Sequence, residues 1–446
     1  MGWSHNFNLK SQNLRMGMQI KQIQKLSKVL YAFIKCKYKA QMDESKYRKY
    51  QLKKLKKITN LAYANIPFYT AKWNQAGFHP SMLKTLEDIN KIPILTKDEL
   101  RSEYLKGLDT SNWKDGRWLA TTGSTGAYVN LFQPSSKINR ELAVMSPLFA
   151  STFFKRKISK GLMFLVIEED SYEAMGGFEL PNPKVRFEDV FTPLVEMVKI
   201  IKEFKPDVIV TYPSRLKELI SYMEDNQINN VNVPTILTSG EKLDEVTRHK
   251  AIKMFHGSIH EAYAVTEVGV IALESPDNNG LKVLDWKIYV EVCDDHGVAL
   301  KENNQLGNII VTDLENDVMP VIRYSGLGDM ASFKNYQKTL LNPIFGRKVD
   351  IVKSPKGRSI HPFKLTLEVQ KVDGINMYQI QQKKINELDV LIIPKKDACH
   401  DTIRKEVDMY MKSALDDDMS INVRLVDMIP RKNKSHKHAT VVSYLQ

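Results

Sequence analysis

Residues 207–240, DVIVTYPSRLKELISYMEDNQINNVNVPTILTSG, decide the fold. The run DVIVTY at 207–212 predicts a buried strand, and the segment from Ser214 onward predicts a helix. TILTSG at 235–240 predicts a second strand that ends in a glycine turn. A strand, a helix and a strand in this order are typical of a parallel βαβ unit.

The same pattern continues on both sides of this stretch. GLMFLVI at 161–167 predicts a further buried strand, and helices are expected at Leu194–Phe204 and Asp244–Phe255. KIYVEVC and GNIIVTD alternate in polarity without an intervening helix, which indicates antiparallel strands. The fold class is therefore α/β, with a large N-terminal domain of parallel βαβ sheets plus antiparallel strands.

The last hundred residues predict a separate, small α+β domain. Its expected strands are YQIQQ, LDVLIIP and INVRLV, with a helix near 400–415 between the last two. We therefore divide the chain into a basic amphipathic segment (1–50), a large domain (51–346) and a small C-terminal domain (347–446). In the N-terminal part, a helix is expected over Ser45–Ala64, and Thr96 with Glu99 forms a capping box that predicts a helix start.

Length and composition place the chain among globular proteins. It has 446 residues, of which 43% are hydrophobic and 26% charged. Its apolar runs are far shorter than a bilayer span, and no early stretch is typical of a signal peptide. Three cysteines without paired spacing argue against a disulfide scaffold and a structural zinc site, which favours the cytoplasm.

The net charge of +13 is concentrated at the N-terminus. Residues 1–60 hold 15 basic and 2 acidic residues, whereas the remainder holds 50 of each sign. This distribution argues against a nucleic-acid-binding core. Ile20, Ile23, Leu26, Leu30 and Phe33 recur at helical spacing beside lysines. Residues 1–40 then either attach the protein peripherally to the inner, anionic face of a membrane or form a helix packed on the main domain, and the second interpretation is favoured.

Four segments have side chains suited to nucleotide chemistry. TTGSTG at 121–126 can present N–H groups and hydroxyls to phosphate, although such a stretch is more often an ordinary turn. Glu267, beside Thr266 after an expected strand, can hold Mg²⁺, although a solvated loop carboxylate is the simpler interpretation. Asp329 follows a glycine-rich turn and can accept from sugar hydroxyls, and Arg347 at the domain junction can meet phosphate or ribose.

The order of these segments is more specific than any one of them. TTGSTG, TSGEKL, YAVTE, RYSGLGD, GRKVD and a C-terminal lysine together resemble the adenylate-forming (AMP-binding, acyl-CoA synthetase-like) superfamily. LAYANIPFYTAKWNQAGF, LEDINKIPILTKDEL and FKPDVIVTYPSRL are similar to the phenylacetate–CoA ligase branch, including CapK-like proteins of capsular polysaccharide biosynthesis. The resemblance covers about residues 50–442.

The resemblance implies a role for each matching residue. The phosphate loop corresponds to Thr121, Thr122, Gly123, Ser124, Thr125 and Gly126, and the adenine-side turn to Ser239, Gly240 and Glu241. It implies adenine stacking by Tyr263, an α-phosphate contact by Thr266, Mg²⁺ binding by Glu267 and ribose binding by Asp329 with Arg347. Lys437, with Lys434 as the rival, would serve adenylation, and the acyl pocket would be lined near Glu168, Tyr212, Ser214, Ala262 and Ala264.

Several positions depart from the family pattern. Ala264 stands where relatives have glycine, Val349 takes the place of the hinge acid, and His436 replaces a glycine before Lys437. Ser275 and Lys282 occupy the places of a Cys and a His found in many close relatives, so no zinc is expected.

The resulting hypothesis is an ATP- and Mg²⁺-dependent ligase that activates a small carboxylic acid or amino acid. An acidic cluster that includes Glu168 is either a solvated loop, the favoured interpretation, or a site for a substrate ammonium group. The acceptor would be CoA, a carrier-protein thiol or an amino sugar, with a role in surface polysaccharide synthesis. The alternative is a catalytically weak relative that acts as a membrane-associated polysaccharide assembly protein, which Ala264 and His436 favour.

Overall fold

The structure is a computed structural model of the whole chain. It describes residues 27–39, 42–120, 129–165, 184–344, 346–347, 352–357, 359–360, 365, 368–369, 371–415, 418–429 and 441–445.

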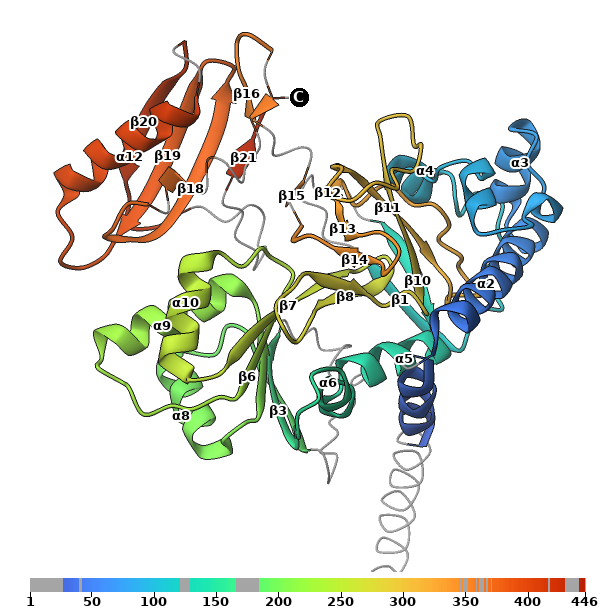
Figure 1. Cartoon of the computed structure of the whole chain (residues 1–446), viewed down its shortest axis with the longest axis horizontal. Coiled ribbons are helices and arrows are strands. Elements are labelled where there is room, and N and C mark those ends of the chain that lie inside the picture. Colours follow the sequence, from blue (N-terminus) through green and yellow to red (C-terminus); the bar gives the residue numbers. More distant parts are fainter. Residues whose placement is uncertain are drawn as a thin grey trace, which may run out of the picture.

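A sheet of nine strands forms the centre of the described part of the large domain (Figure 1). Five neighbouring strands are parallel, in the spatial order β7, β6, β5, β3, β4: β7 (Ser258–Val265), β6 (Thr235–Ser239), β5 (Val208–Thr211), β3 (Lys160–Leu165) and β4 (Lys184–Asp189). The sheet continues with antiparallel strands: β8 (Gly269–Glu274), β9 (Leu281–Val283), β14 (Leu340–Leu341) and β13 (Phe333–Asn335). The predicted parallel βαβ units and the α/β class are thereby confirmed.

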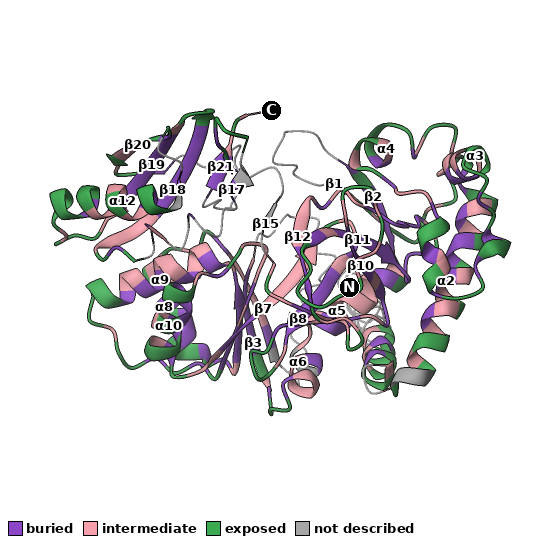
Figure 2. Cartoon of the chain, turned by 45° about the horizontal axis from the view of Figure 1, so that its top comes forward, coloured by how far each residue is buried: buried purple, intermediate pink, exposed green. Residues whose placement is uncertain are grey.

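Helices cover both faces of the parallel strands. The first face carries α8 (Leu194–Phe204), α9 (Pro213–Asp225) and α10 (Glu245–Phe255), which bury their inner sides against it and expose their outer sides (Figure 2). Alternate residues of one strand serve opposite faces: Leu162 and Phe164 pack with these helices, whereas Met163 packs with Phe154 on the other side. The other face carries α5 (Ser135–Met145) and α6 (Pro147–Phe153).

A second, antiparallel sheet lies beside the first. Its strand order is β10 (Ile288–Cys293), β11 (Gly307–Asp313), β12 (Asp329–Ala331) and β15 (Gly346–Arg347). The hairpin of β1 (Gly116–Ala120) and β2 (Asn130–Pro134) and the N-terminal helical elements contribute to the same core. These elements are α2 (Glu44–Asn65), α3 (Pro67–Gln75), η1 (Pro80–Met82), η2 (Glu87–Lys91) and α4 (Lys97–Ser102). The predicted capping box is confirmed, because Thr96 and Glu99 bond reciprocally at the start of α4.

The C-terminal part has a hydrophobic core of its own, formed by residues between Val352 and Val441. Its sheet has the order β20 (Ser420–Leu425), β19 (Glu387–Pro394), β18 (Ile375–Lys384) and β21 (Val441–Ser443), and α12 (His400–Ala414) packs beside it. β16 (Val352–Lys353) pairs with β17 (Ser359–Ile360). The Nζ of Lys217 on α9 lies 5.7 Å from the ring centroid of Tyr378 on β18, which joins the two parts.

The N-terminal helix packs on the large domain through Phe33 of the predicted stripe and through small residues outside the stripe. Residues 27–39 are helical, and Ala32 and Cys36 are buried against a cluster that includes Phe149 and Trp286. Leu30, which the sequence pattern assigned to the packing face, is 48% exposed. Phe33 thus packs against this cluster whereas Leu30 does not, and the small side chains of Ala32 and Cys36 allow the helix to approach closely. Residues 20–26 lie outside the described part of the chain.

Candidate active site

The candidate residues gather where the parallel strands end. β5, β6 and β7 run side by side in the same direction, so Tyr212, Glu241 and Thr266 all follow the same edge of the sheet. In an open α/β sheet, ligands bind in the crevice outside the carboxyl ends of the strands. The site is therefore built on this edge.

The turn after β6 is fixed to the start of α9. Ser239 pairs in register with Ala262 of β7, and Gly240 has a φ of +83°, which suits glycine. The carboxylate of Glu241 accepts hydrogen bonds from the Ser214 backbone N–H at 2.8 Å and from its hydroxyl at 3.0 Å. These bonds satisfy a donor at the helix N-terminus and hold two predicted site segments together.

Tyr263 and Asp329 meet across 66 residues of sequence. The Tyr263 hydroxyl donates to Oδ2 of Asp329 at 2.7 Å. Asp329 begins β12, where it pairs in register with Arg347 of β15, so three residues assigned to adenine and ribose are adjacent. The side chain of Arg347 lies outside the described residues.

Thr266 and Glu267 form the turn between β7 and β8. Thr266 is exposed, and Glu267 is half-buried. The hydroxyl of Tyr324 donates to Oε1 of Glu267 at 3.2 Å. Burial and the charge of Glu267 raise the pKa of Tyr324, so the phenol remains a donor at neutral pH. Sequence analysis missed Tyr324, although it lies within RYSGLGD, the segment that supplies Asp329.

Buried charged side chains of α5 hold the backbone of this turn in place. The Nζ of Lys137 on α5 donates to the carbonyl oxygen of Val268 at 3.0 Å and also pairs with Asp313. Glu141, one turn further along α5, accepts from the Val270 N–H at 3.2 Å and pairs with Lys287. Since Lys137 is 1% and Asp313 0% exposed, breaking this pair would leave an uncompensated buried charge.

Gly269 is required at the end of the turn. Its φ is +83°, and a Cβ added there would lie 2.5 Å from a carboxylate oxygen of Glu141. The backbone conformation therefore favours glycine, and a side chain here would require the Glu141 carboxylate to shift. The glycine lets Glu141 approach the backbone directly after Glu267.

The predicted acyl pocket is described in part. Tyr212 caps the start of α9, and Ser214 is held by Glu241. Ala262 and Ala264 are half-buried on β7 and pack at the edge of the apolar cluster that contains Phe149 and the N-terminal helix. Glu168 lies outside the described residues.

Other predicted residues also fall outside the described residues: Thr121, Thr122, Gly123, Ser124, Thr125, Gly126, Lys434 and Lys437. The strands that flank the predicted phosphate loop are described, and they pair Ala120 with Asn130.

No cluster of three or more His, Cys, Asp or Glu side chains suited to a metal ion occurs among the described residues. The residues present nevertheless fit Mg²⁺ in its usual nucleotide-bound form. Mg²⁺ is commonly held by one or two carboxylates together with substrate phosphates, and Glu267 supplies one carboxylate. Tyr324 donates to Oε1 of Glu267, and among the described residues no hydrogen bond reaches Oε2.

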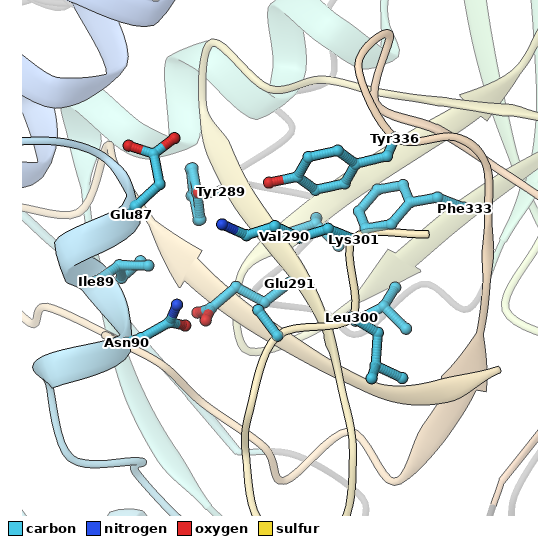
Figure 3. Close-up of a pocket in the computed structure, with 12 residues that line it drawn as sticks. Glu87, Ile89, Asn90, Tyr289, Val290, Glu291, Leu300, Lys301, Phe333 and Tyr336 are labelled. Atoms are coloured by element: carbon cyan, nitrogen blue, oxygen red, sulfur yellow. The ribbon is translucent and has the colours of Figure 1, made fainter. Parts of the chain in front are cut away.

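A small pocket elsewhere on the large domain is not part of this site. It lies between η2 and the β10–β11 hairpin, and its lining includes Glu87, Tyr289, Glu291 and Lys301 (Figure 3). Glu291 is buried there in a salt bridge to Arg323, with the Arg323 Nη2 3.0 Å from its Oε1. None of the predicted site residues lines this pocket.

Comparisons with known proteins agree with the motif order. The model of the CapK C-terminal domain matches residues 352–443. The phenylacetate–coenzyme A ligase of Pseudomonas putida is 22% identical over 358 residues, which are 77% of this chain and 80% of that protein.

Solved structures share the fold. The 2-hydroxyisobutyryl-CoA ligase in its postadenylation state, in complex with 2-HIB-AMP, superposes with a TM-score of 0.73 at 19% identity, covering 89% of this chain and 90% of that one. With the same enzyme in its thioesterification state, in complex with 2-HIB-AMP and CoA, the TM-score is 0.60 at 20% identity, with 90% of each chain covered.

Fold, site order and comparisons agree on one class: this chain has the fold of the adenylate-forming ligases. Within that class it is a relative of the phenylacetate–coenzyme A ligases and has a C-terminal domain of the CapK type. The resemblance inferred from the sequence is confirmed.

Proposed function

We propose that this protein uses ATP to convert a carboxylic acid into an acyl adenylate and then transfers the acyl group to coenzyme A. The observation that carries the proposal is the convergence of Tyr263, Asp329 and Glu267 at the carboxyl edge of the parallel strands. The proposal is supported by the similarity of most of this chain to the phenylacetate–coenzyme A ligases.

Nucleotide binding follows from the side chains on this edge. The ring of Tyr263 offers a stacking face for adenine, and the Asp329 carboxylate accepts from ribose hydroxyls while it holds the Tyr263 hydroxyl. Thr121–Gly126 would enclose the β- and γ-phosphates. Glu267 and the phosphates would hold Mg²⁺, which neutralises charge on the departing pyrophosphate.

The reaction has two steps. A carboxylate oxygen of the acid attacks the α-phosphorus of ATP, the bond to the bridging oxygen breaks, and pyrophosphate leaves. The thiolate of coenzyme A then attacks the acyl carbon, and AMP leaves with the electron pair of the C–O bond. Thr266 and Lys437 would donate to the α-phosphate region, where negative charge develops in the first step.

The domain arrangement suits such a sequence of steps. We propose that residues 347–446 form a small mobile domain that carries Lys437 and turns about the 346–350 segment between adenylation and transfer. The contact between Lys217 and Tyr378 would then belong to one of the two arrangements.

Substrate and pathway are the finer part of the proposal. A small organic acid suits a pocket lined by Tyr212, Ser214, Ala262 and Ala264, and a carrier-protein thiol or an amino sugar remains an alternative acceptor. The CapK-type C-terminal domain supports a role in surface polysaccharide synthesis inside the cell.

A second function, that of a catalytically weak polysaccharide assembly protein at the membrane, is favoured by Ala264 and His436, which replace family glycines. Isothermal titration with Mg·ATP separates the two functions, since an assembly protein that does not bind the nucleotide should release no heat.

For the ligase, acid-dependent ATP–pyrophosphate exchange over a panel of carboxylic and amino acids should identify the acid. AMP release with and without coenzyme A should then identify the acceptor. A protein that binds Mg·ATP but exchanges with no acid would contradict the ligase proposal.

A further inference from the structure

The N-terminal helix has two different apolar faces. One face, with Ala32 and Cys36, is buried in the large domain. The other is exposed and consists of Leu30 (48% exposed), Tyr31 (60%), Ile34 (57%) and Tyr38 (69%). At 100° per residue, these four side chains form one stripe along the helix, turned away from the buried face.

Lysines border this stripe on both sides. Lys28 and Lys35 lie along one margin and Lys37 along the other, and all three are exposed. The Nζ of Lys35 lies 4.2 Å from the ring centroid of Tyr31, so this cation sits beside the apolar surface. An exposed apolar stripe flanked by flexible cations matches the boundary between acyl chains and anionic headgroups.

The helix is held rigidly enough to present this stripe. Lys39 at its end forms a salt bridge of 3.1 Å with the buried carboxylate of Glu315, which Lys54 and Arg140 also contact. Cys36 is fully buried. The exposed stripe is therefore a fixed surface of the folded protein.

The segments next to this helix in the sequence are positively charged as well. On α2, Lys49 and Lys53 are exposed one helical turn apart. Residues 1–26, which lie outside the described part, contain four basic residues and no acidic residue. Basic residues near a membrane surface strengthen binding to anionic lipid, so this end of the molecule is charge-complementary to an anionic bilayer.

The N-terminal helix lies far from the C-terminal sheet. In Figure 1 it is the dark blue helix below α2 and beside α5, whereas the C-terminal sheet of β18–β21 lies at the opposite end. No helix among the described residues is long and apolar enough to cross a membrane. Contact through this stripe would be peripheral.

We propose that the stripe Leu30–Tyr31–Ile34–Tyr38, with its bordering lysines Lys28, Lys35 and Lys37, is a docking surface for an anionic lipid bilayer. Tyr31 and Tyr38 place aromatic rings at the headgroup level, Leu30 and Ile34 enter the acyl boundary, and the lysines pair with lipid phosphates. The proposal does not depend on the ligase activity.

The test is cosedimentation of the full-length protein with phosphatidylcholine vesicles, with and without about 25% phosphatidylglycerol. The wild type should bind the anionic vesicles and release in about 0.5 M NaCl, because salt screens the lysines. Lys28→Glu/Lys35→Glu/Lys37→Glu should weaken binding on the order of a hundredfold. The matched control is Lys334→Glu/Lys396→Glu/Lys405→Glu, which changes net charge equally on exposed residues elsewhere and should bind as the wild type does.

A second pair of variants tests the apolar part. Tyr31→Ser/Ile34→Ser should lose binding, whereas Val195→Ser/Met428→Ser, at residues 61% and 76% exposed on other elements, should keep it. Circular dichroism and thermal melting check that all variants fold. Equal binding by the stripe variants and their controls would overturn the proposal. So would a wild type that ignores anionic vesicles but forms a dimer, by light scattering, that Tyr31→Ser/Ile34→Ser dissociates.

Discussion

The hydroxyl of Tyr263 donates a hydrogen bond of 2.7 Å to Oδ2 of Asp329, which ties the end of β7 to the start of β12. The two residues were assigned separately, one to adenine and the other to ribose. Under the proposed function, their direct bond means that the ring proposed to stack on adenine and the carboxylate proposed to bind ribose hold each other in place before nucleotide arrives. Such preorganisation lowers the ordering cost of binding.

Tyr263→Phe should weaken Mg·ATP binding by about tenfold, because it removes this bond and leaves the stacking ring. Tyr263→Ala should weaken it further, since the ring is lost as well. Isothermal titration measures both. Equal affinities for Tyr263→Phe and the wild type would mean that Asp329 needs no support from the phenol.

Glu267→Gln should abolish acid-dependent ATP–pyrophosphate exchange while the melting temperature stays near that of the wild type. The amide keeps the shape but removes the charge that would hold Mg²⁺. Tyr324→Phe removes the neighbouring donor at 3.2 Å and should weaken Mn²⁺ binding in the presence of ATP, measured by electron paramagnetic resonance, less than Glu267→Gln does. Unchanged exchange in Glu267→Gln would remove this residue from the metal-binding role.

Lys437→Ala should reduce adenylation more than thioester formation from supplied acyl adenylate, because the cation acts where charge develops on the α-phosphate. Lys434→Ala is the matched control, three residues away with the same charge change. Both half-reactions are measured for each variant. Equal losses in the two half-reactions of Lys437→Ala would contradict a dedicated adenylation role, and a larger loss in Lys434→Ala would transfer the role to that lysine.

Gly269→Ala should destabilise the protein by more than Gly328→Ala does. Both glycines have positive φ, +83° and +69°, but a Cβ at 269 meets Glu141 whereas one at 328 has no atom within 4 Å. The strain of a positive φ alone costs on the order of 1 kcal/mol, and the clash with Glu141 adds to it. Denaturant unfolding of the two variants isolates the clash; equal losses would show that Glu141 simply moves aside.

The low pKa of Glu315 leads us to expect that the N-terminal helix is held less firmly in acid. Burial would raise its pKa, but Arg140, Lys39 and Lys54 lower it from 4.5 to about 2. Because the folded pKa lies below the unfolded one, this stabilisation is complete above pH 4.5 and is lost as pH falls towards 2. The shift corresponds to about 3 kcal/mol.

Unfolding free energies measured from pH 7 downward should therefore fall in this window. Glu315→Gln should flatten the fall and be less stable at pH 7, because the three cations lose their common anion. Glu302→Gln, at an exposed acid elsewhere on the large domain, is the control and should leave the profile unchanged. An identical profile for Glu315→Gln would exclude Glu315 as the titrating group.

Much of the fold was predictable because its strands are short, apolar and separated by amphipathic helices. Leu194–Phe204 was predicted with its observed bounds, since five of its eleven residues are buried at helical spacing. The ordered motifs also placed Tyr263 and Asp329 in one site. Their hydrogen bond, and the approach of Tyr324 to Glu267, depend on the register of distant strands, which local patterns do not encode.

The sequence pattern did not show which side of the N-terminal helix packs on the large domain, for a physical reason. A hydrophobic pattern gives weight to large residues such as Leu30, whereas close packing against Trp286 favours the small side chains of Ala32 and Cys36. An amphipathic pattern assumes one apolar face, and this helix has two.

The apolar cluster around Phe149 joins Ala32 and Cys36 of the N-terminal helix to Ala262 and Ala264 of the proposed acyl pocket. Removing the first forty residues would expose this cluster beside the proposed acyl pocket, so we expect the shortened protein to lose turnover even without lipid. Under the two proposals made above, the helix that meets the bilayer and the strand that meets the acid share one apolar cluster.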